Sequence, residues 1–183
     1  IGSVSVIKAA GLNRIISFDM GGTSTDVAHY GGEYERSLET KVDGIRIRAP
    51  MMQIHTIAAG GGSICSFEGG RYRVGPASAG AEPGPACYRK NGPLTVTDCN
   101  LILGKLQPDF FPKVFGPKQD QSLDANIVIK KFGKLAEEIY SNNGDKRTPT
   151  EVAEGFLRIA VDNMANGIRK ISVQKGHDVT EYA

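Results

Sequence analysis

The sequence predicts an α/β fold in which a strand-rich first part is followed by a helical last part. Residues 14–57 carry short apolar or alternating runs separated by Gly-rich turns, which is typical of strands joined by tight turns. Residues 124–171 instead repeat apolar side chains at helical spacing. We expect an incomplete domain with a mixed β-sheet and packing helices. Its expected parts are a strand-rich part at about 12–75, a Gly/Pro-rich loop at 75–95 and a helical part at about 97–175.

The strand-rich part is preceded by residues 1–13, which fit either a helix end capped by Gly11 or a strand; we favour the helix. Arg14–Asp19 is predicted to be a buried first strand, because an apolar run fills it. Further strands are expected at residues 27–30, 34–40, 44–48 and 52–57, and a hairpin at residues 63–74.

A glycine- and proline-rich segment then follows, and it fits neither a helix nor a central strand. Its low charge, and the apolar character of Cys87 and Tyr88, favour an ordered loop that lines a cleft or an interface. An irregular arm at residues 105–123 comes next. It carries Phe110, Phe111 and Phe115, and we expect these aromatic side chains to be buried.

The helical part contains three predicted helices. The first is short, with Thr97 or Asp98 as its cap and Gly104 at its end. The second begins after Asp124, and the third begins at Thr148, where Glu151 completes a capping box. Apolar side chains of the third helix form one stripe, which we interpret as core and not as a cofactor site. Its members are Val152, Phe156, Ile159, Ala160, Met164, Ile168 and Ile171.

Composition narrows the possible partners and compartments. The 183 residues have a net charge of +2 with scattered basic side chains, which argues against nucleic-acid or membrane-surface binding. No apolar run is long enough for a transmembrane helix, and no signal peptide is apparent. Three widely spaced cysteines favour reduced thiols in a cytoplasmic protein. Because the chain does not begin with Met, we expect it to be an internal piece of a longer protein.

The most informative stretch runs from Asp19 to Asp26, where two glycines and three hydroxyl residues lie between two acids. A plain hairpin turn is one interpretation. The other is a phosphate loop, because bare backbone N–H groups and hydroxyls form anion-binding concavities. Asp19 then holds Mg²⁺ through water beside the phosphate, the alternative being a turn aspartate bonded to its own backbone. The candidate binding residues are Asp19, Gly21, Gly22, Thr23, Ser24, Thr25 and Asp26. Asp26 either orients water or fixes the loop, and fixing the loop is the safer interpretation.

For the other side chains that could carry chemistry, we favour a structural role. His55 is a candidate base or metal ligand, but a lone histidine on a strand is more often structural. Cys87 lacks a partner motif and is interpreted as a buried structural thiol, and Asp98 as a cap. Residues 60–62 and the loop at 75–88 form either a ligand or domain interface or simply the backbone geometry that glycine permits. His29 and His177 receive no role.

The sequence resembles a known family over nearly its whole length. Asp19-Met-Gly-Gly-Thr-Ser-Thr-Asp26 is similar to the Asp-x-Gly-Gly-Thr-x-x-Asp phosphate loops of the actin, sugar-kinase and heat-shock ATPase superfamily. Within it, the chain resembles the hydantoinase A and 5-oxoprolinase family, and most closely its ATP-hydrolysing 5-oxoprolinase members. The further matching stretches are residues 56–64, 74–88, 88–95, 95–101 and 108–117.

The resemblance implies a ribonuclease H-like (actin-like ATPase) lobe, a hydantoinase A-type domain fragment, that uses ATP and Mg²⁺. It implies cleavage of a cyclic amide coupled to ATP hydrolysis, with 5-oxo-L-proline yielding L-glutamate in cytoplasmic glutathione metabolism. There are two alternatives to a 5-oxoprolinase. One is a hydantoin-cleaving relative, and the other is that the isolated chain is a non-catalytic module. The partners implied are the N-terminal lobe of hydantoinase A, a hydantoinase B-like half and further copies of the full-length protein. The isolated chain is expected to be inactive.

Overall fold

The chain forms two compact units, each of which gathers segments that are distant in sequence. The computed structural model describes the backbone of residues 1–183 and every side chain except those of Lys41 and Val42. The first unit contains Ile1–Asp19, Thr25–Ile57 and Ala165–Ala183, and the second contains Met20–Ser24 and Ala58–Met164. No helix in the described part of the chain is both long enough and apolar enough to cross a membrane.

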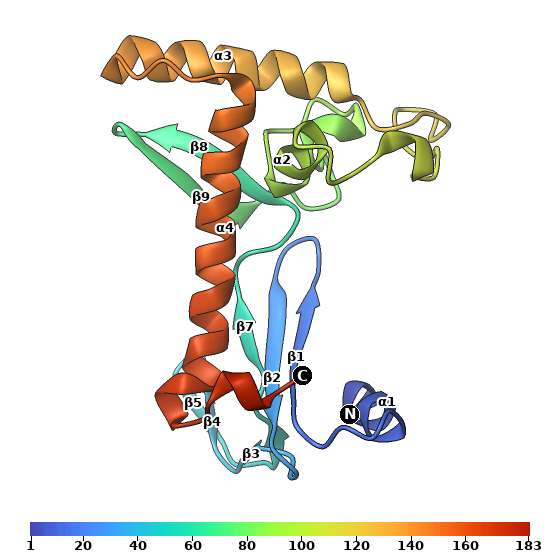
Figure 1. The fold of residues 1–183 in the computed structure, drawn as a ribbon, viewed down its shortest axis with the longest axis vertical. Coiled ribbons are helices and arrows are strands. Elements are labelled where there is room, and N and C mark those ends of the chain that lie inside the picture. Colours follow the sequence, from blue (N-terminus) through green and yellow to red (C-terminus); the bar gives the residue numbers. More distant parts are fainter. The chain divides into compact units, whose positions relative to one another are not determined.

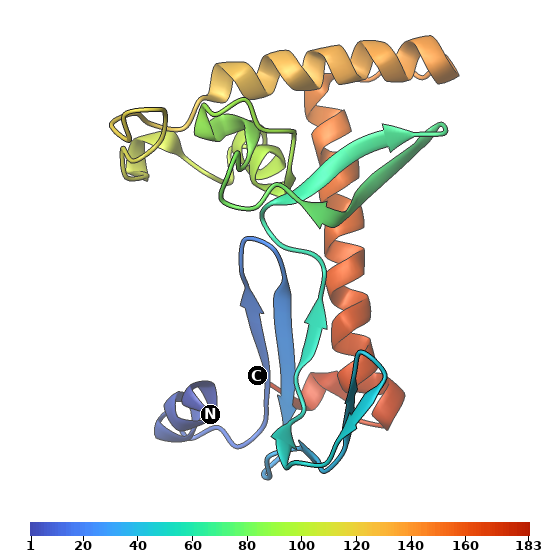
Figure 2. The ribbon, with the colours of Figure 1, turned by 180° about the vertical axis from the view of Figure 1, so that it is seen from behind.

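The first unit is built on a three-stranded sheet of order β1-β2-β7 (Figure 2). β2 alternates buried and exposed side chains, with Thr25, Val27 and His29 facing inward, as the two-residue period of a strand requires. Its register with β7 is antiparallel and pairs Val27 with His55. The strands span Ile15–Met20 (β1), Thr25–Tyr30 (β2) and His55–Ile57 (β7).

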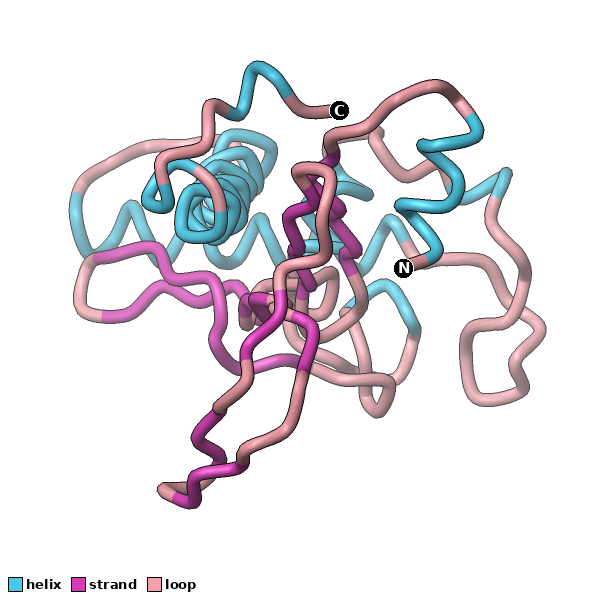
Figure 3. The backbone as a smooth tube through the Cα atoms, turned by 90° about the horizontal axis from the view of Figure 1, so that it is seen from below, coloured by secondary structure: helices cyan, strands magenta, loops and turns pink.

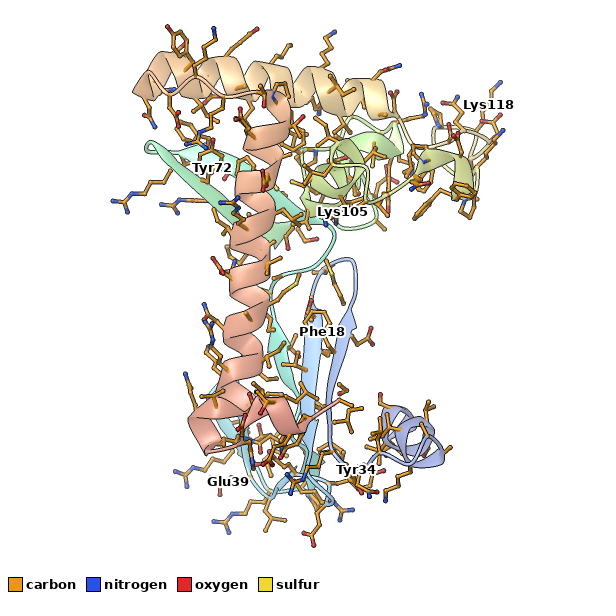
Figure 4. All side chains as sticks on the ribbon, in the orientation of Figure 1. Phe18, Tyr34, Glu39, Tyr72, Lys105 and Lys118 are labelled. Carbon is orange, nitrogen blue, oxygen red and sulfur yellow. The ribbon has the colours of Figure 1, made fainter. Side chains whose placement is uncertain are left out.

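The prediction that Arg14–Asp19 is a buried strand is wrong for most of its residues, because only Ile15 is buried and Ile16 and Ser17 are half-buried. Ile15 is buried, but Phe18 is 44% exposed (Figure 4), because β1 lies at an edge of the sheet. The predicted helix before it is confirmed as α1 (Gly2–Ala9), and its Val4 packs with Ile15 and Tyr30.

Short strands complete the first unit. The strand predicted at 34–40 contains only a two-residue strand, β3 (Arg36–Ser37), and the first residue of β4 (Thr40–Val42). The strand predicted at 52–57 is divided between β6 (Met51–Met52) and β7. The antiparallel pairs are β3 with β6, and β4 with β5 (Ile45–Ile47). Arg46 and Arg48 are exposed and pair with Glu39. At the C-terminal end of the chain, the first unit also contains two 3-10 helices, η3 (Val173–Lys175) and η4 (Val179–Glu181).

The second unit holds the larger hydrophobic core. The hairpin β8 (Ser63–Glu68) and β9 (Arg71–Ser78) packs on α4 (Pro149–Ile171), whose Pro149–Met164 part belongs to this unit. The rings of Tyr72 and Phe156 lie 4.7 Å apart across this contact (Figure 4). α2 (Val96–Ile102) packs beneath α3 (Ala125–Asn143) (Figure 1). The chain therefore contains four small sheets, not the single mixed sheet that we expected.

The helix starts follow from local capping chemistry. Asp124 caps α3, with its carboxylate accepting from Ile127 N at 3.0 Å. The capping box at α4 is confirmed, since Glu151 N donates to Thr148 Oγ1 at 3.2 Å. The cap predicted for α2 is wrong: Thr95 is the cap, and Asp98 is the third helical residue of a capping box.

The arm between α2 and α3 is mainly loop (Figure 3), with one short 3-10 turn, η2 (Pro108–Phe110). A second 3-10 turn, η1 (Ala86–Tyr88), lies before α2. The arm's aromatic residues are only partly buried, contrary to expectation. Phe115 packs on Tyr88 with ring centroids 4.5 Å apart, but Phe110 is 85% exposed. A three-residue 3-10 turn offers too little surface to cover two adjacent phenylalanines, so Phe110 is left facing water.

Candidate functional site

Two glycine-rich segments pair through their backbones in the second unit. Gly21 N donates to Ser24 O at 2.8 Å and closes a tight turn. Gly61 N then donates to Gly21 O at 3.0 Å, and Gly62 N donates to Gly22 O at 2.6 Å. The turn at Met20–Ser24 is therefore held by its own hydrogen bond and by the glycine triplet at residues 60–62.

The glycine triplet is required by this close approach. A Cβ atom at Gly60 would lie 2.7 Å from Gly21 O, and one at Gly62 would lie 2.9 Å from Gly22 O. A Cβ atom at Gly61 would lie 2.9 Å from Thr97 Oγ1. Because real Cβ atoms do not come so near other heavy atoms, only glycine allows the two backbones to meet here. The triplet thus serves both backbone geometry and the placement of the candidate phosphate loop.

The turn leaves three successive backbone N–H groups available to a ligand. Within the described part of the chain, the N–H groups of Gly22, Thr23 and Ser24 donate to no protein acceptor. Thr23 is exposed, and its hydroxyl accepts from Ser78 Oγ at 3.4 Å. Consecutive unpaired N–H groups in a turn form a concavity of positive potential that suits an anion such as phosphate.

The two acids that bracket the motif lie in the first unit. Asp19 lies in β1, where it is exposed and makes no side-chain hydrogen bond within the described residues. Asp26 is exposed on β2 and accepts a hydrogen bond from Thr56 Oγ1 of β7 at 2.6 Å. This bond joins β2 to β7. Thr25 is fully buried, so its side chain faces the interior of its unit.

A buried carboxylate fixes the Gly/Pro-rich loop against α2. Asp98 is fully buried, and its oxygens accept from the N–H groups of Ala86, Cys87 and Thr95 at 2.8–3.0 Å, and from the Thr95 hydroxyl at 3.0 Å. Three of these hydrogen bonds go to Oδ2 and one goes to Oδ1, and such extensive pairing within the protein identifies a structural acid. Asp98 is therefore a structural residue, as the third helical residue of the capping box and not the cap itself, and it also positions the loop.

Cys87 is not placed for nucleophilic chemistry, and His55 belongs to no cluster of potential metal ligands among the described residues. Burial, together with the charge of Asp98, raises the pKa of the Cys87 thiol far above its usual range, so the nucleophilic thiolate is strongly disfavoured. His55 lies half-buried on β7 opposite Val27. All three cysteines are free, as expected.

A cluster of titratable side chains in the first unit was missed by sequence reasoning. His29 Nδ1 lies 2.6 Å from Glu35 Oε1, His177 Nε2 lies 3.6 Å from the same oxygen, and Lys175 Nζ lies 2.6 Å from Glu35 Oε2. The two imidazole planes are stacked at 4.0 Å and 19°, so their in-plane lone pairs do not converge on one ion. We interpret the cluster as a hydrogen-bonded charge network. No spacing signal could have found it, because its members lie on separate segments.

Comparison with known proteins places this geometry in a family. The profile of the family described as Hydantoinase/oxoprolinase matches residues 1–183. The chain is 52% identical over 169 residues to a 5-oxoprolinase of Saccharomyces cerevisiae. The aligned region covers 92% of this chain and 13% of that protein. The chain is 48% identical over 172 residues to a 5-oxoprolinase of Dictyostelium discoideum, again 92% of this chain and 14% of that protein.

Two solved structures are also similar to this chain. An ATP-dependent caprolactamase from Pseudomonas jessenii matches with a TM-score of 0.78 and 34% identity, over 98% of this chain and 25% of that chain. A nucleotide-free acetone carboxylase matches with a TM-score of 0.80 over 99% of this chain, and at 24% identity it shows the mixed α/β fold alone. The chain thus spans about 13–14% of the length of the two curated relatives described. Because the family profile covers all 183 residues, the chain belongs to the hydantoinase/oxoprolinase family.

Proposed function

We propose that this chain is the phosphate-binding part of an ATP-dependent hydrolase of cyclic amides, and that the full-length protein is a 5-oxoprolinase. The observation that carries the proposal is the set of unpaired N–H groups at Gly22, Thr23 and Ser24, in a turn that the glycine triplet holds in place. The substrate class rests on the relatives, since the 5-oxoprolinases are closer in sequence than the caprolactamase.

The residues present fit a magnesium nucleotide. Gly21, Gly22, Thr23 and Ser24 are the proposed phosphate-side residues. Thr25 was expected among them, but it is left out because its side chain is fully buried in the first unit. Asp19 offers an exposed carboxylate, which is the hard oxygen ligand that Mg²⁺ prefers, usually through retained waters. Bound Mg²⁺ would neutralise phosphate charge. Asp26 is proposed to fix the loop through Thr56.

The physical role of the loop is electrostatic. An unstrained lactam resists hydrolysis. Transfer of the γ-phosphoryl group from ATP to the amide oxygen would release ADP and activate the amide carbon; water would then add to that carbon, phosphate would leave and the C–N bond would break to open the ring. The unpaired backbone N–H groups of the turn would donate to phosphoryl oxygens and stabilise the charge that develops on them. The protein's contribution at this loop is thus positioning and charge stabilisation.

The proposal extends to features that rest on family likeness. They are a ribonuclease H-like (actin-like ATPase) lobe, a cytoplasmic location, a role in glutathione metabolism, and assembly of the full-length protein with itself. The N-terminal lobe of hydantoinase A and a hydantoinase B-like half are the proposed neighbours in the longer protein. The adenosine contacts are proposed to lie outside these 183 residues.

The test is ATP turnover by the purified full-length protein with 5-oxo-L-proline, with hydantoin, or with no cyclic amide. We expect 5-oxo-L-proline to give the fastest ADP release, matched by glutamate formation. Faster turnover with hydantoin would assign the hydantoin-cleaving alternative instead. The isolated chain is expected to show no lactam-dependent turnover in the same assay. If the full-length protein released ADP equally with and without every cyclic amide, the proposed function would be wrong.

A further inference from the structure

A pocket of about 280 Å³ opens beside the glycine turn, entirely within the second unit. One side is formed by the backbone of the turn and of Gly61. The other sides come from η1, α2, the arm and the residue before the α3 cap. The lining residues are Met20, Gly21, Gly22, Gly61, Tyr88, Thr97, Asn100, Leu106, Phe111 and Leu123.

The size and lining of the pocket suit a small ring better than a nucleotide. Ligand pockets usually span about 300–1,000 Å³, so this one lies just below that range. Its wall is mostly apolar, formed by Tyr88, Leu106, Phe111 and Leu123. Tyr88 is stacked on Phe115, which in turn lies 6.3 Å from Phe111, so the aromatic wall is supported from behind. A compact, partly apolar ring matches this wall.

Besides the Tyr88 hydroxyl, Asn100 brings a polar side-chain group to the pocket. Its backbone carbonyl accepts from Lys105 N at 2.9 Å and from Leu106 N at 3.0 Å, which fixes the residue at the end of α2. Its side-chain amide makes no hydrogen bond within the described residues. The neighbouring Thr97 hydroxyl is already used, because it donates to Gly61 O at 2.9 Å.

The chemistry of a side-chain amide matches that of a lactam. An asparagine amide carries a donor and an acceptor side by side. A lactam is a cis amide, so its N–H and its C=O also lie on one edge of the ring. The two groups can therefore form two parallel hydrogen bonds, as two amides do when they pair edge to edge. A linear trans amide presents its N–H and C=O on opposite edges and cannot pair in this way.

We propose that this pocket binds the cyclic amide, that Asn100 recognises its amide edge, and that Phe111 and Tyr88 contact its ring. The inference rests on the proposed function, since it places the amide beside the turn that we assign to phosphate. Gly21 and Gly22 contribute to both sites, so a bound ring would lie next to the phosphoryl group that it is to receive. Asn100 is a substrate-recognition residue in this proposal.

The test uses the full-length protein with Asn100→Ala, the near-isosteric Asn100→Asp, and Phe111→Ala. Asn100→Asp keeps the shape but cannot donate to the lactam carbonyl. We expect each Asn100 variant to raise the KM for 5-oxo-L-proline about tenfold or more, with the KM for ATP unchanged. Phe111→Ala should raise the same KM several-fold. Phe110→Ala is the matched control, because Phe110 is 85% exposed and does not line the pocket; it should leave both KM values unchanged.

Binding gives a second readout that is independent of turnover. Calorimetric titration of 5-oxo-L-proline into the full-length protein, saturated with a non-hydrolysable ATP analogue, should show weakening by Asn100→Asp and none by Phe110→Ala. A wild-type protein with no lactam-dependent turnover would contradict the proposed function itself. A wild-type protein that turns over 5-oxo-L-proline, but whose Asn100 variants keep its KM and affinity or raise the KM for ATP instead, would overturn the pocket assignment alone.

Discussion

Gly60 sets how closely two backbone segments approach in the second unit. Its added Cβ atom would lie 2.7 Å from Gly21 O and 2.9 Å from Gly22 C, and both are backbone atoms that cannot turn aside. We expect Gly60→Ala to lower the free energy of unfolding by about 2 kcal/mol, as overpacking typically does. It should also weaken Mg-ATP binding by the full-length protein, because the turn must move. Urea unfolding of the 183-residue chain and ATP titration measure the two effects.

Gly133 provides the matched control for that substitution. It lies inside α3, and an added Cβ atom there meets nothing within 4 Å. Gly133→Ala should raise the free energy of unfolding by about 0.5–1 kcal/mol, because alanine has the higher helix propensity. Equal stability of the Gly60 and Gly133 variants would show that the close approach is not required for the fold.

His29 should make the first unit sensitive to mild acid. Burial lowers the pKa of His29 below its ordinary value near 6.5, although its hydrogen bond to Glu35 opposes the shift. The folded state therefore binds fewer protons at His29 than the unfolded state, and stability falls as the pH drops below about 6.5. The pKa of Glu35 is lowered despite burial, chiefly by Lys175, so its contribution is lost only at lower pH.

The measurement is the free energy of unfolding of the 183-residue chain at pH 7.5 and pH 5.5. We expect the wild-type chain to lose stability over this interval, and His29→Asn, which keeps a donor near the Nδ1 position but does not titrate, to lose less. An equal loss in the two proteins would place the acid sensitivity elsewhere.

At the scale of elements, the Gly/Pro-rich loop depends on one side chain of α2. Asp98 accepts four hydrogen bonds while fully buried, three of them from backbone N–H groups. Asp98→Ala leaves these donors buried and unpaired, and we expect a loss of about 3–5 kcal/mol. Thr148→Ala removes an exposed cap of α4 and should cost only about 1 kcal/mol. Urea unfolding compares the two variants, and similar losses would contradict the proposed role of Asp98.

Elements with strong local signals could be predicted from the sequence. The helix capped by Asp124, the capping box at Thr148 and Glu151, and the hairpin at residues 63–74 all depend on neighbouring residues, and the structure confirms them. The start of α2 was misplaced because Thr95 and Thr97 are both good caps by type. What decides between them is the burial of Asp98 against the loop at residues 86–87, which is a tertiary contact.

At the scale of the whole molecule, the sequence indicated the α/β class and the phosphate motif but not the way in which segments combine. The pairing of Gly60–Gly62 with Gly21–Gly22 joins residues about forty positions apart, and no local pattern encodes that distance. No local pattern predicts that Asn100 and Phe111 line one pocket, or that His29, Glu35 and His177 form one network. The buried first strand and the buried arm aromatics were misjudged because apolar sequence shows what prefers burial, not what covers it.

We propose that the turn after Asp19 binds ATP phosphates with Mg²⁺ in the full-length protein. The most direct test of this proposal is calorimetric titration of Mg-ATP into that protein and into its Asp19→Asn variant, with Asp109→Asn, an exposed acid of the arm, as the control. We predict at least about tenfold weaker binding for Asp19→Asn, equivalent to about 1.4 kcal/mol, and unchanged binding for Asp109→Asn. Unchanged affinity in the Asp19→Asn variant would contradict the account.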